Sequence, residues 1–232
     1  MKFVVTAGPT REFIDPVRFL SNPSTGRMGF AVARAARAAG HEVTLIAGPV
    51  ALKTPPGVTR IDVVSACDML AAVLAELGGA QLVAPENATV LVMTAAVADW
   101  RPARRASRKL KKSEMSDTLK LVRNPDILKT IDRQLGGPRS RAAARPIRIG
   151  FAAETGAPAA EAARKCREKG LDLVVGNDVT EPGSGFGTDT NRVTFVTPDG
   201  NVQRLPLMSK LAVARRIVSF AEAVAQRKGT DA

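Results

Sequence analysis

Short apolar runs that are typical of buried β-strands alternate with stretches of helical periodicity along most of this 232-residue chain. The alternation predicts strands at residues 2–6, 41–47, 59–64, 89–94, 147–152 and 172–175, and helices at residues 27–39, 66–77, 125–135, 157–169 and 209–226. Strands and helices that follow one another in this way form βαβ units. The sequence therefore predicts an α/β fold with a Rossmann-like, doubly wound and mainly parallel sheet.

Two segments depart from the alternation. Residues 98–118 are rich in charge and turn residues, and we expect them to form a basic flap that leads into a short strand at 118–122. Residues 192–197 and 202–205 flank Asp199-Gly200, a dipeptide typical of a tight hairpin. We expect one domain over residues 1–232, with the flap at about 98–118 and a C-terminal hairpin and helix at about 191–228.

The net charge of +12 is concentrated in two segments. Residues 101–112 contain seven Lys or Arg and residues 133–148 contain five Arg, and neither segment contains an acid. Such segments form solvated basic surface or bind anions. Only Trp100 and Phe151 lie near the candidate motifs, so the stacking platforms that single-stranded nucleic acids need are scarce. The pattern favours small phosphates over a polynucleotide.

The residues that are missing or isolated exclude several classes of protein. Cys67 and Cys166 are too few for a disulfide scaffold, so we expect reduced thiols and a cytoplasmic location. The N-terminal sequence MKFVVTAGPT has only a short apolar run before turn residues, so we expect no signal peptide. No apolar run approaches the roughly 20 residues that cross a bilayer. Tyrosine is absent, and the only histidine, His41, falls in a predicted turn far from the motifs below. Catalysis by histidine, by a cysteine nucleophile or by a dehydrogenase tyrosine is therefore not expected.

Small and polar residues follow four of the predicted strands. They lie at residues 6–11, 94–99, 151–155 and 176–178. In open α/β sheets, ligands bind beyond the carboxyl ends of the strands. Small residues there let backbone N–H groups approach a ligand closely. We therefore expect these four segments to converge on one binding pocket.

The loop after the first predicted strand is long, from Ala7 to about Thr25, and it leads into a predicted helix. Ser24, Thr25 and Gly26 precede the helix at 27–39, and backbone N–H groups in such a position bind anions. The spacing matches neither GxGxxG nor GxxxxGK[ST]. An anion site and ordinary N-capping by a side chain both remain open.

Carboxylates and lysines near the same edge are candidates for metal and phosphate binding. Asp99, Asp126 and Asp178 are candidate ligands for Mg²⁺ or Mn²⁺, since Mg²⁺ takes one or two carboxylates together with phosphates. Asp126 could equally stabilise the first turn of its helix. The KLKK segment at 109–112 is either solvated or covers a phosphate site and neutralises its charge.

Taken together, the motifs resemble those of phosphopantothenoylcysteine synthetase, a ligase of coenzyme A biosynthesis. The resemblance is carried, in order, by TAGPTREFIDPVRFLSNPSTGRMG (6–29), TAAVADWRP (94–102), KLKK (109–112), NPDIL (124–128), GFAAET (150–155) and KGLDLVVGNDV (169–179). It implies a Rossmann-like homodimer that joins 4′-phosphopantothenate to L-cysteine, with a nucleoside triphosphate, CTP favoured over ATP, and Mg²⁺. It also implies an acyl-nucleotide intermediate and a decarboxylase that is either fused or separate.

The resemblance implies roles for individual residues as well. Asn22 matches the asparagine that holds the acyl-nucleotide, Arg18 an arginine that reaches the substrate from the neighbouring subunit, and Lys109 the phosphate-binding lysine of the flap. Substrate contacts are also implied for Ala95, Ala96 and Asp99. Nucleotide contacts are implied for Gly8, Ser24, Gly26, Gly29, Met93, Thr94, Ala95, Asp99, Lys109, Pro125, Asp126, Ile127, Leu128, Phe151, Lys165, Lys169 and Asn177.

Some residues depart from the family pattern, and two other functions stay open. Pro9 stands where a second glycine is usual, Pro23 where histidine is usual, and Trp100 where tyrosine or phenylalanine is usual. A dinucleotide oxidoreductase would need the glycine fingerprint that is missing here. A basic nucleotide-binding or nucleic-acid-binding protein without catalytic activity is the other alternative, and its binding would fall steeply with salt.

Overall fold

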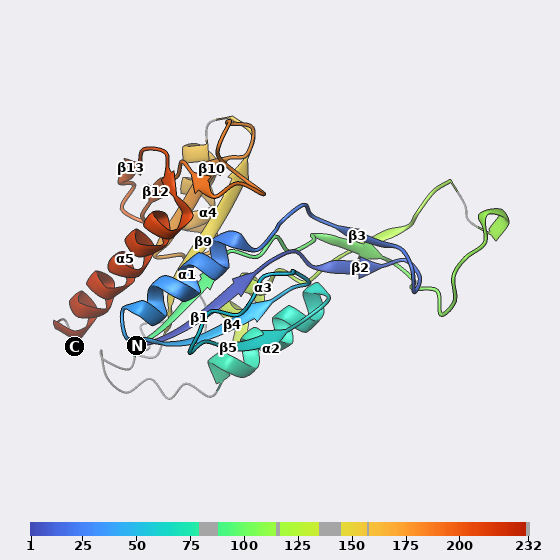
Figure 1. Cartoon of the computed structure of the whole chain (residues 1–232), viewed down its shortest axis with the longest axis horizontal. Helices are drawn as coiled ribbons and strands as arrows, with labels where there is room; N and C mark the ends of the chain where they lie inside the picture. The colour runs from blue at the N-terminus through green and yellow to red at the C-terminus, as the bar shows by residue number, and fades with distance from the viewer. Residues whose placement is uncertain (79–87, 115–116, 135–144, 157, 231–232) are drawn as a thin grey trace.

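The structure is a computed structural model that describes residues 1–78, 88–114, 117–134, 145–156 and 158–230. An eight-stranded sheet forms its centre (Figure 1). Parallel strands make up most of it, in the spatial order β10 (Leu173–Asp178), β9 (Ile147–Glu154), β6 (Thr89–Met93), β1 (Lys2–Ala7), β4 (Glu42–Ala47) and β5 (Thr59–Asp62). The prediction of a Rossmann-like, mainly parallel sheet is confirmed.

The C-terminal hairpin extends this sheet beyond β10. β12 (Thr194–Val196) pairs antiparallel with β10 and with β13 (Val202–Arg204). Gly200 in the connecting turn has a φ of 86°, a conformation that glycine adopts without steric cost. The predicted hairpin is therefore present at the edge of the sheet.

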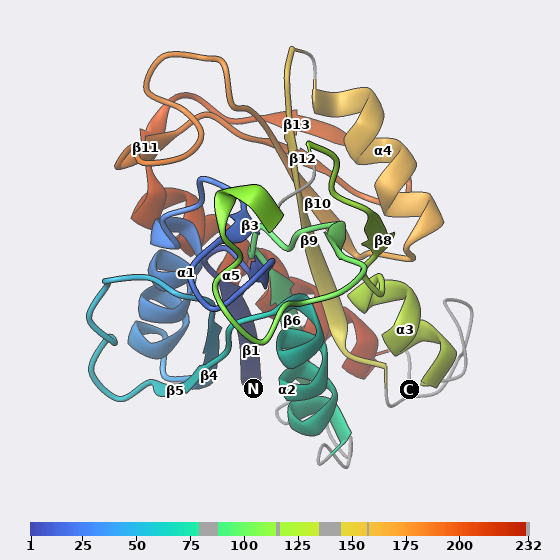
Figure 2. The same ribbon diagram turned by 90° about the vertical axis from the view of Figure 1, so that its right-hand side faces the viewer.

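Helices cover both faces of the sheet, as a doubly wound fold requires. α1 (Arg27–Ala38) and α5 (Lys210–Thr230) pack on one face. α2 (Ala66–Gly78), α3 (Ile127–Gln134) and α4 (Pro158–Glu168) pack on the other (Figure 2). Each face has its own cluster of buried apolar side chains, so the sheet is the apolar middle layer of the molecule.

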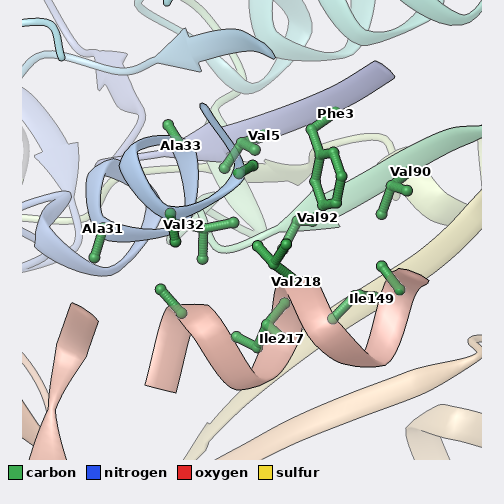
Figure 3. Close-up of a cluster of buried hydrophobic side chains, with 14 of the residues drawn as sticks. Phe3, Val5, Ala31, Val32, Ala33, Val90, Val92, Ile149, Ile217 and Val218 are labelled. Atoms are coloured by element: carbon green, nitrogen blue, oxygen red, sulfur yellow. The ribbon is translucent and has the colours of Figure 1, made fainter. Parts of the chain in front are cut away.

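The central strands supply both clusters because side chains alternate along a strand. Phe3 and Val5 of β1 point toward α1 and α5, whereas Val4 belongs to the opposite cluster. Figure 3 shows Phe3 and Val5 near Val32 of α1 and Ile217 of α5. Burial on both faces explains why these strands read as continuous apolar runs.

An arm projects from the carboxyl edge of the sheet and contains short strands, most of which sequence periodicity did not predict (Figure 1). β2 (Arg11–Phe13) pairs antiparallel with β3 (Phe19–Ser21), and β7 (Trp100–Pro102) pairs with β8 (Leu121–Arg123). The segment from Ala7 to about Thr25, expected to be a long loop, therefore contains two short paired strands. The strand predicted at 118–122 is shifted to Leu121–Arg123, because its register follows Trp100–Pro102.

Several other boundaries differ from the predictions for local reasons. α3 begins at Ile127, two residues after Pro125, because the Asp126 carboxylate accepts a hydrogen bond from the Lys129 N–H at 3.1 Å and caps the helix. β10 extends to Asp178, because Asn177 and Asp178 pair with Ala153 and Glu154 of β9. β11 (Thr190–Asn191) and β14 (Met208–Ser209) form a further small sheet that was not predicted.

The second basic segment contains arginines that are used inside the fold. Arg148 is only 2% exposed and forms an ion pair with Asp132, while Arg145 lies 3.7 Å from the Asp172 carboxylate. Residues 135–144 of this segment lie outside the described residues. The expectation of solvated surface is therefore wrong for Arg148. Within the described ranges, no helix combines the length and the apolar character needed to cross a membrane.

Candidate functional site

The residues that follow β6 form the wall of a pocket at the carboxyl edge of the sheet. This pocket, the larger of two that adjoin each other, has a volume of about 680 Å³, within the range of small-molecule sites. Residues 95–100 form one side, residues 123–129 at the start of α3 form a second, and Phe151, Lys165 and Lys169 form a third. Asp99, Pro125, Asp126, Ile127 and Leu128 of the predicted site line this pocket, as does Met93.

A smaller pocket adjoins the larger one. Its volume is about 110 Å³, and the predicted residues Ser24, Gly26, Gly29, Thr94 and Asn177 line it. Ala95, Ala96 and Phe151 line both pockets. The two pockets are therefore neighbouring parts of one candidate site.

The ends of β1 and β6 are joined by hydrogen bonds at this point. The Ala96 N–H donates to the Gly8 carbonyl at 2.9 Å, and the Ala95 N–H donates to the Thr6 hydroxyl at 3.2 Å. The Ala98 N–H donates to the Thr10 hydroxyl at 3.0 Å. Gly8 has a φ of 78°, and a Cβ atom there would lie 2.9 Å from a Val50 methyl group, so only glycine suits this turn. Gly8 thus positions the pocket wall through its backbone.

Asn22 belongs to the same hydrogen-bond network. Its Nδ2 donates to the Ala96 carbonyl at 3.0 Å, although Asn22 and Ala96 are far apart in sequence. The Ser21 hydroxyl donates to the Thr10 carbonyl at 2.8 Å and fixes the chain beside it. Asn22 is therefore held against the segment that separates the two pockets.

The start of α1 lies in the smaller pocket without a side-chain cap. Gly26 is the N-cap residue, with a φ of 78°, and no side chain accepts a hydrogen bond from the first turn. The Ser24 hydroxyl instead accepts a hydrogen bond from the Gly26 N–H at 3.4 Å. Ordinary N-capping, the alternative left open above, is not what the structure shows. The amide groups at this helix end are suited to an anion.

Two lysines of the larger pocket, Lys165 and Lys169, are paired with acids. Lys165 Nζ lies 2.8 Å from the Glu154 carboxylate, and Lys169 Nζ lies 3.1 Å from the Asp126 carboxylate. Both pairs are partly exposed, so each contributes little to stability. The two pairs neutralise only part of the positive charge, because Arg123 and Lys129 also line this pocket.

Arg18 and the flap meet on the arm, outside the lining of both pockets. The buried Asp15 carboxylate binds the Arg18 guanidinium and accepts hydrogen bonds from the N–H groups of Arg18 at 2.9 Å and Leu110 at 3.2 Å. The Arg18 Nη2 also donates to the Leu110 carbonyl at 3.0 Å. The guanidinium of Arg18 holds the pKa of Asp15 well below its usual range. Lys109, next to Leu110, is exposed.

The candidate metal ligands do not form a preformed centre. No group of three or more His, Cys, Asp or Glu side chains gathers as a metal site in the part of the chain that the structure describes. Asp99 and Asp126 line the same pocket, but Asp126 is engaged with Lys169. Asp178 accepts hydrogen bonds from the Thr180 N–H and hydroxyl, which lower its pKa. Asp99 is the candidate best suited to bind a metal together with a phosphate-bearing ligand.

Sequence reasoning missed several residues of the smaller pocket. Gly185 and Phe186 come from the loop after β10, Asn191 ends β11, and Lys210 is the first residue of α5. A glycine-rich turn at the same edge of the sheet was the available signal. The lysine could not be found from sequence, because only the tertiary fold brings it to this loop.

The fold and the paired pockets define a Rossmann-like α/β protein with a candidate ligand site at the carboxyl edge of the sheet. Residues 1–224 match the family described as DNA/pantothenate metabolism flavoprotein, C-terminal domain, and the chain belongs to this family.

Two relatives show how much of a longer protein this chain resembles. The coenzyme A biosynthesis bifunctional protein CoaBC of Bacillus subtilis (strain 168) is 45% identical over 227 residues, which cover 97% of this chain and 52% of the relative. CoaBC of Escherichia coli (strain K12) is 39% identical over 229 residues, which cover 96% of this chain and 53% of the relative. The chain therefore spans about half the length of the curated relatives it matches.

Solved structures agree with this fold. The crystal structure of the C-terminal domain of a CoaBC protein has a TM-score of 0.76 and 38% identity, and the match covers 97% of this chain and 96% of that one. A variant of Cab2, solved in complex with phosphopantothenate-cysteine, has a TM-score of 0.71 but only 16% identity, and the match covers 99% of this chain and 88% of that one. The similarity to the Cab2 variant therefore concerns the fold alone.

Close packing at the start of α1 leads to a first prediction. A Cβ atom at Gly29 would lie 2.5 Å from both the Ala7 Cβ and the Thr94 hydroxyl, and 2.9 Å from the Thr6 carbonyl. We expect Gly29→Ala to lower the free energy of unfolding by about 1–3 kcal/mol through overpacking. Urea denaturation measures the change.

Gly78→Ala is the matched control, because nothing lies within 4 Å of a Cβ atom there and the residue is helical. It should change the free energy of unfolding by less than about 1 kcal/mol. Equal stabilities for the two variants would contradict the close approach of α1 to β1 and β6.

Proposed function

We propose that this chain is a ligase that joins 4′-phosphopantothenate to L-cysteine through an acyl-nucleotide intermediate, as one domain over residues 1–232. Membership of the family and the similarity to the C-terminal half of CoaBC proteins support the activity. The observation that carries the proposal is the junction of the two pockets at Ala95 and Ala96, with Asn22 bound to the Ala96 carbonyl. A carboxylate and an α-phosphate can meet at such a junction.

The pocket volumes indicate how the ligands are arranged. The larger pocket can hold a nucleoside, with Phe151 and residues 125–128 around it, whereas the smaller one suits a phosphate group at the start of α1. We infer that the nucleotide lies across both pockets. The nucleotide is CTP in this proposal, in line with the resemblance of the sequence to the bacterial ligase.

The proposed reaction has two steps and needs little acid–base chemistry from the protein. A carboxylate oxygen of the substrate attacks the α-phosphorus, the bond to the pyrophosphate leaving group breaks, and an acyl-cytidylate forms. The cysteine amine then attacks the acyl carbon, the C–O bond to CMP breaks, and the amine loses a proton. Positioning and charge neutralisation are the main contributions of the site.

A divalent metal fits this arrangement at Asp99. The Asp99 carboxylate is exposed at the larger pocket and pairs with none of the residues that the structure describes. Mg²⁺ binds through one or two carboxylates plus substrate phosphates, so Asp99 would hold it, with Asp126 as a second ligand if Lys169 moves away. Bound there, Mg²⁺ would neutralise negative charge on the phosphates.

We also propose that the protein acts as a homodimer through its arm. Val17 is 56% exposed, and Phe19, Leu119 and Leu121 on the same arm are also exposed apolar residues. Arg18 lies among them and would reach the site of the second subunit. A decarboxylase, fused or separate, would supply or consume pathway intermediates. Cys67 and Cys166 are both free thiols, which suits a reducing compartment such as the cytoplasm.

Product analysis tests the proposed activity. The protein is incubated with 4′-phosphopantothenate, L-cysteine, Mg²⁺ and either CTP or ATP. We expect phosphopantothenoylcysteine and pyrophosphate with release of CMP, and slower reaction with ATP. The absence of this product with both nucleotides would overturn the proposal, and faster release of AMP would overturn the choice of CTP.

Asn22→Asp tests the second step. The variant cannot donate the hydrogen bond to the Ala96 carbonyl, and it adds a negative charge beside the acyl-nucleotide. We expect pyrophosphate release to stay largely intact while cysteine-dependent product falls by about 100-fold or more. Separate assays of the two half-reactions measure this split.

Asn201→Asp makes the same change in the exposed turn of the C-terminal hairpin and should leave both half-reactions unchanged. An equal loss of both half-reactions in Asn22→Asp would refute the assigned role of Asn22.

Lys109→Gln tests the flap. Because Lys109 is exposed on the arm, its replacement should leave the melting temperature unchanged. Loss of a charged hydrogen bond to a phosphate should slow acyl-nucleotide formation by about 10- to 100-fold. Single-turnover pyrophosphate release measures the rate, with Lys53→Gln, another exposed lysine, as the control. A marked drop in stability, or an unchanged rate, would count against this role.

A further inference from the structure

A buried lysine lines the smaller pocket, and none of the site residues described so far accounts for its burial. Lys210, the first residue of α5, is 6% exposed. Its Nζ donates hydrogen bonds to the carbonyl oxygens of Gly185 at 2.8 Å and Thr188 at 2.6 Å, and lies 3.4 Å from the Thr188 hydroxyl. These partners are all neutral, so they orient the ammonium group without compensating its charge.

No carboxylate among the described residues forms an ion pair with Lys210. The nearby Asp189 pairs with Arg27, and its side chain is 89% exposed. Burial, followed by the charge of Arg27, lowers the pKa of Lys210 from its ordinary value, and the Asp189 carboxylate opposes this shift only in part. A buried charge that is compensated only in part is costly, and a bound anion would reduce that cost.

The surroundings of Lys210 are rigid and suited to an anion. The Asn191 side-chain oxygen accepts hydrogen bonds from the Ser184 hydroxyl at 2.6 Å and the Gly185 N–H at 3.2 Å, which fixes the loop that Lys210 binds. The uncapped start of α1 lines the same pocket. A buried cation and the positive end of a helix therefore share one small space.

We propose that Lys210 is a phosphate-binding residue, and that it supplies the counter-charge for the polyphosphate of the nucleotide in the smaller pocket. This inference rests on the proposed function and adds a residue to it. The chemical class of the ligand is a polyphosphate chain, recognised by its charge and not by its base. Lys210 orients the phosphates before the carboxylate attacks.

Binding of inorganic tripolyphosphate tests the inference, because this probe carries the charge without a nucleoside. Isothermal titration is performed on the whole chain and on Lys210→Met, which keeps the side-chain length but removes the charge. We expect the affinity to fall about tenfold or more, as for loss of a charged hydrogen bond. Lys2→Met removes the same charge at the opposite end of β1 and should bind like the parent protein.

The salt dependence of binding separates an electrostatic role from a structural one. Affinity of the parent protein should fall with increasing salt, and Lys210→Met should show a smaller slope. Thr188→Val, which keeps the lysine but removes a hydroxyl near it, should retain the parent slope. If Lys210→Met does not fold, Lys210→Gln replaces it, because its amide can still donate to the loop carbonyls.

The outcomes distinguish this inference from the proposed function. If the parent protein forms product but binds tripolyphosphate no better than Lys210→Met, or not at all, the inference fails and the ligase proposal stands. An equal salt slope in the two proteins would also overturn it, since Lys210 would then act only through the loop. If the parent protein neither forms product nor binds the probe, both proposals fall.

Discussion

The join between the carboxyl ends of β1 and β6 is the constraint on which the candidate site depends. Thr6, Gly8 and Thr10 accept hydrogen bonds from the N–H groups of Ala95, Ala96 and Ala98 in turn, and Asn22 binds the carbonyl of Ala96. The segment between the two pockets is thereby fixed by the two central strands. Because those strands are buried on both faces, the geometry of the site is inherited from the most rigid part of the fold.

The two pockets differ in the hydrogen-bond and ion-pair partners of their lysines. In the larger pocket, Lys165 and Lys169 are each paired with a carboxylate. The smaller pocket combines an uncapped helix start with Lys210, whose hydrogen-bond acceptors are neutral. In the proposed arrangement, the phosphates of the nucleotide occupy the smaller pocket and the nucleoside occupies the larger one.

The sequence predicts those parts of the fold that depend on patterns within a short stretch of chain. The apolar runs of β1, β4, β6 and β9 gave the central sheet, and the small residues after them indicated the edge where the pockets lie. The arm strands β2, β3 and β7 were missed because they are short and pair mainly within the arm, which leaves little periodicity. Lys210 was missed for a different reason: its importance comes from burial, and burial depends on the tertiary fold.

Several basic residues of the arm make contacts that hold the arm itself together. Arg101 donates to the Arg123 carbonyl and the Asn124 side chain, and the Arg105 guanidinium stacks on Phe13. Asp15 meanwhile links Arg18 to the flap, and its lowered pKa keeps the carboxylate charged. A carboxyl group with a depressed pKa stabilises the folded state above its ordinary pKa and loses this effect only as pH falls through the lowered value. The link between arm and flap therefore persists near neutral pH, so any movement of Lys109 toward a phosphate starts from an anchored Leu110.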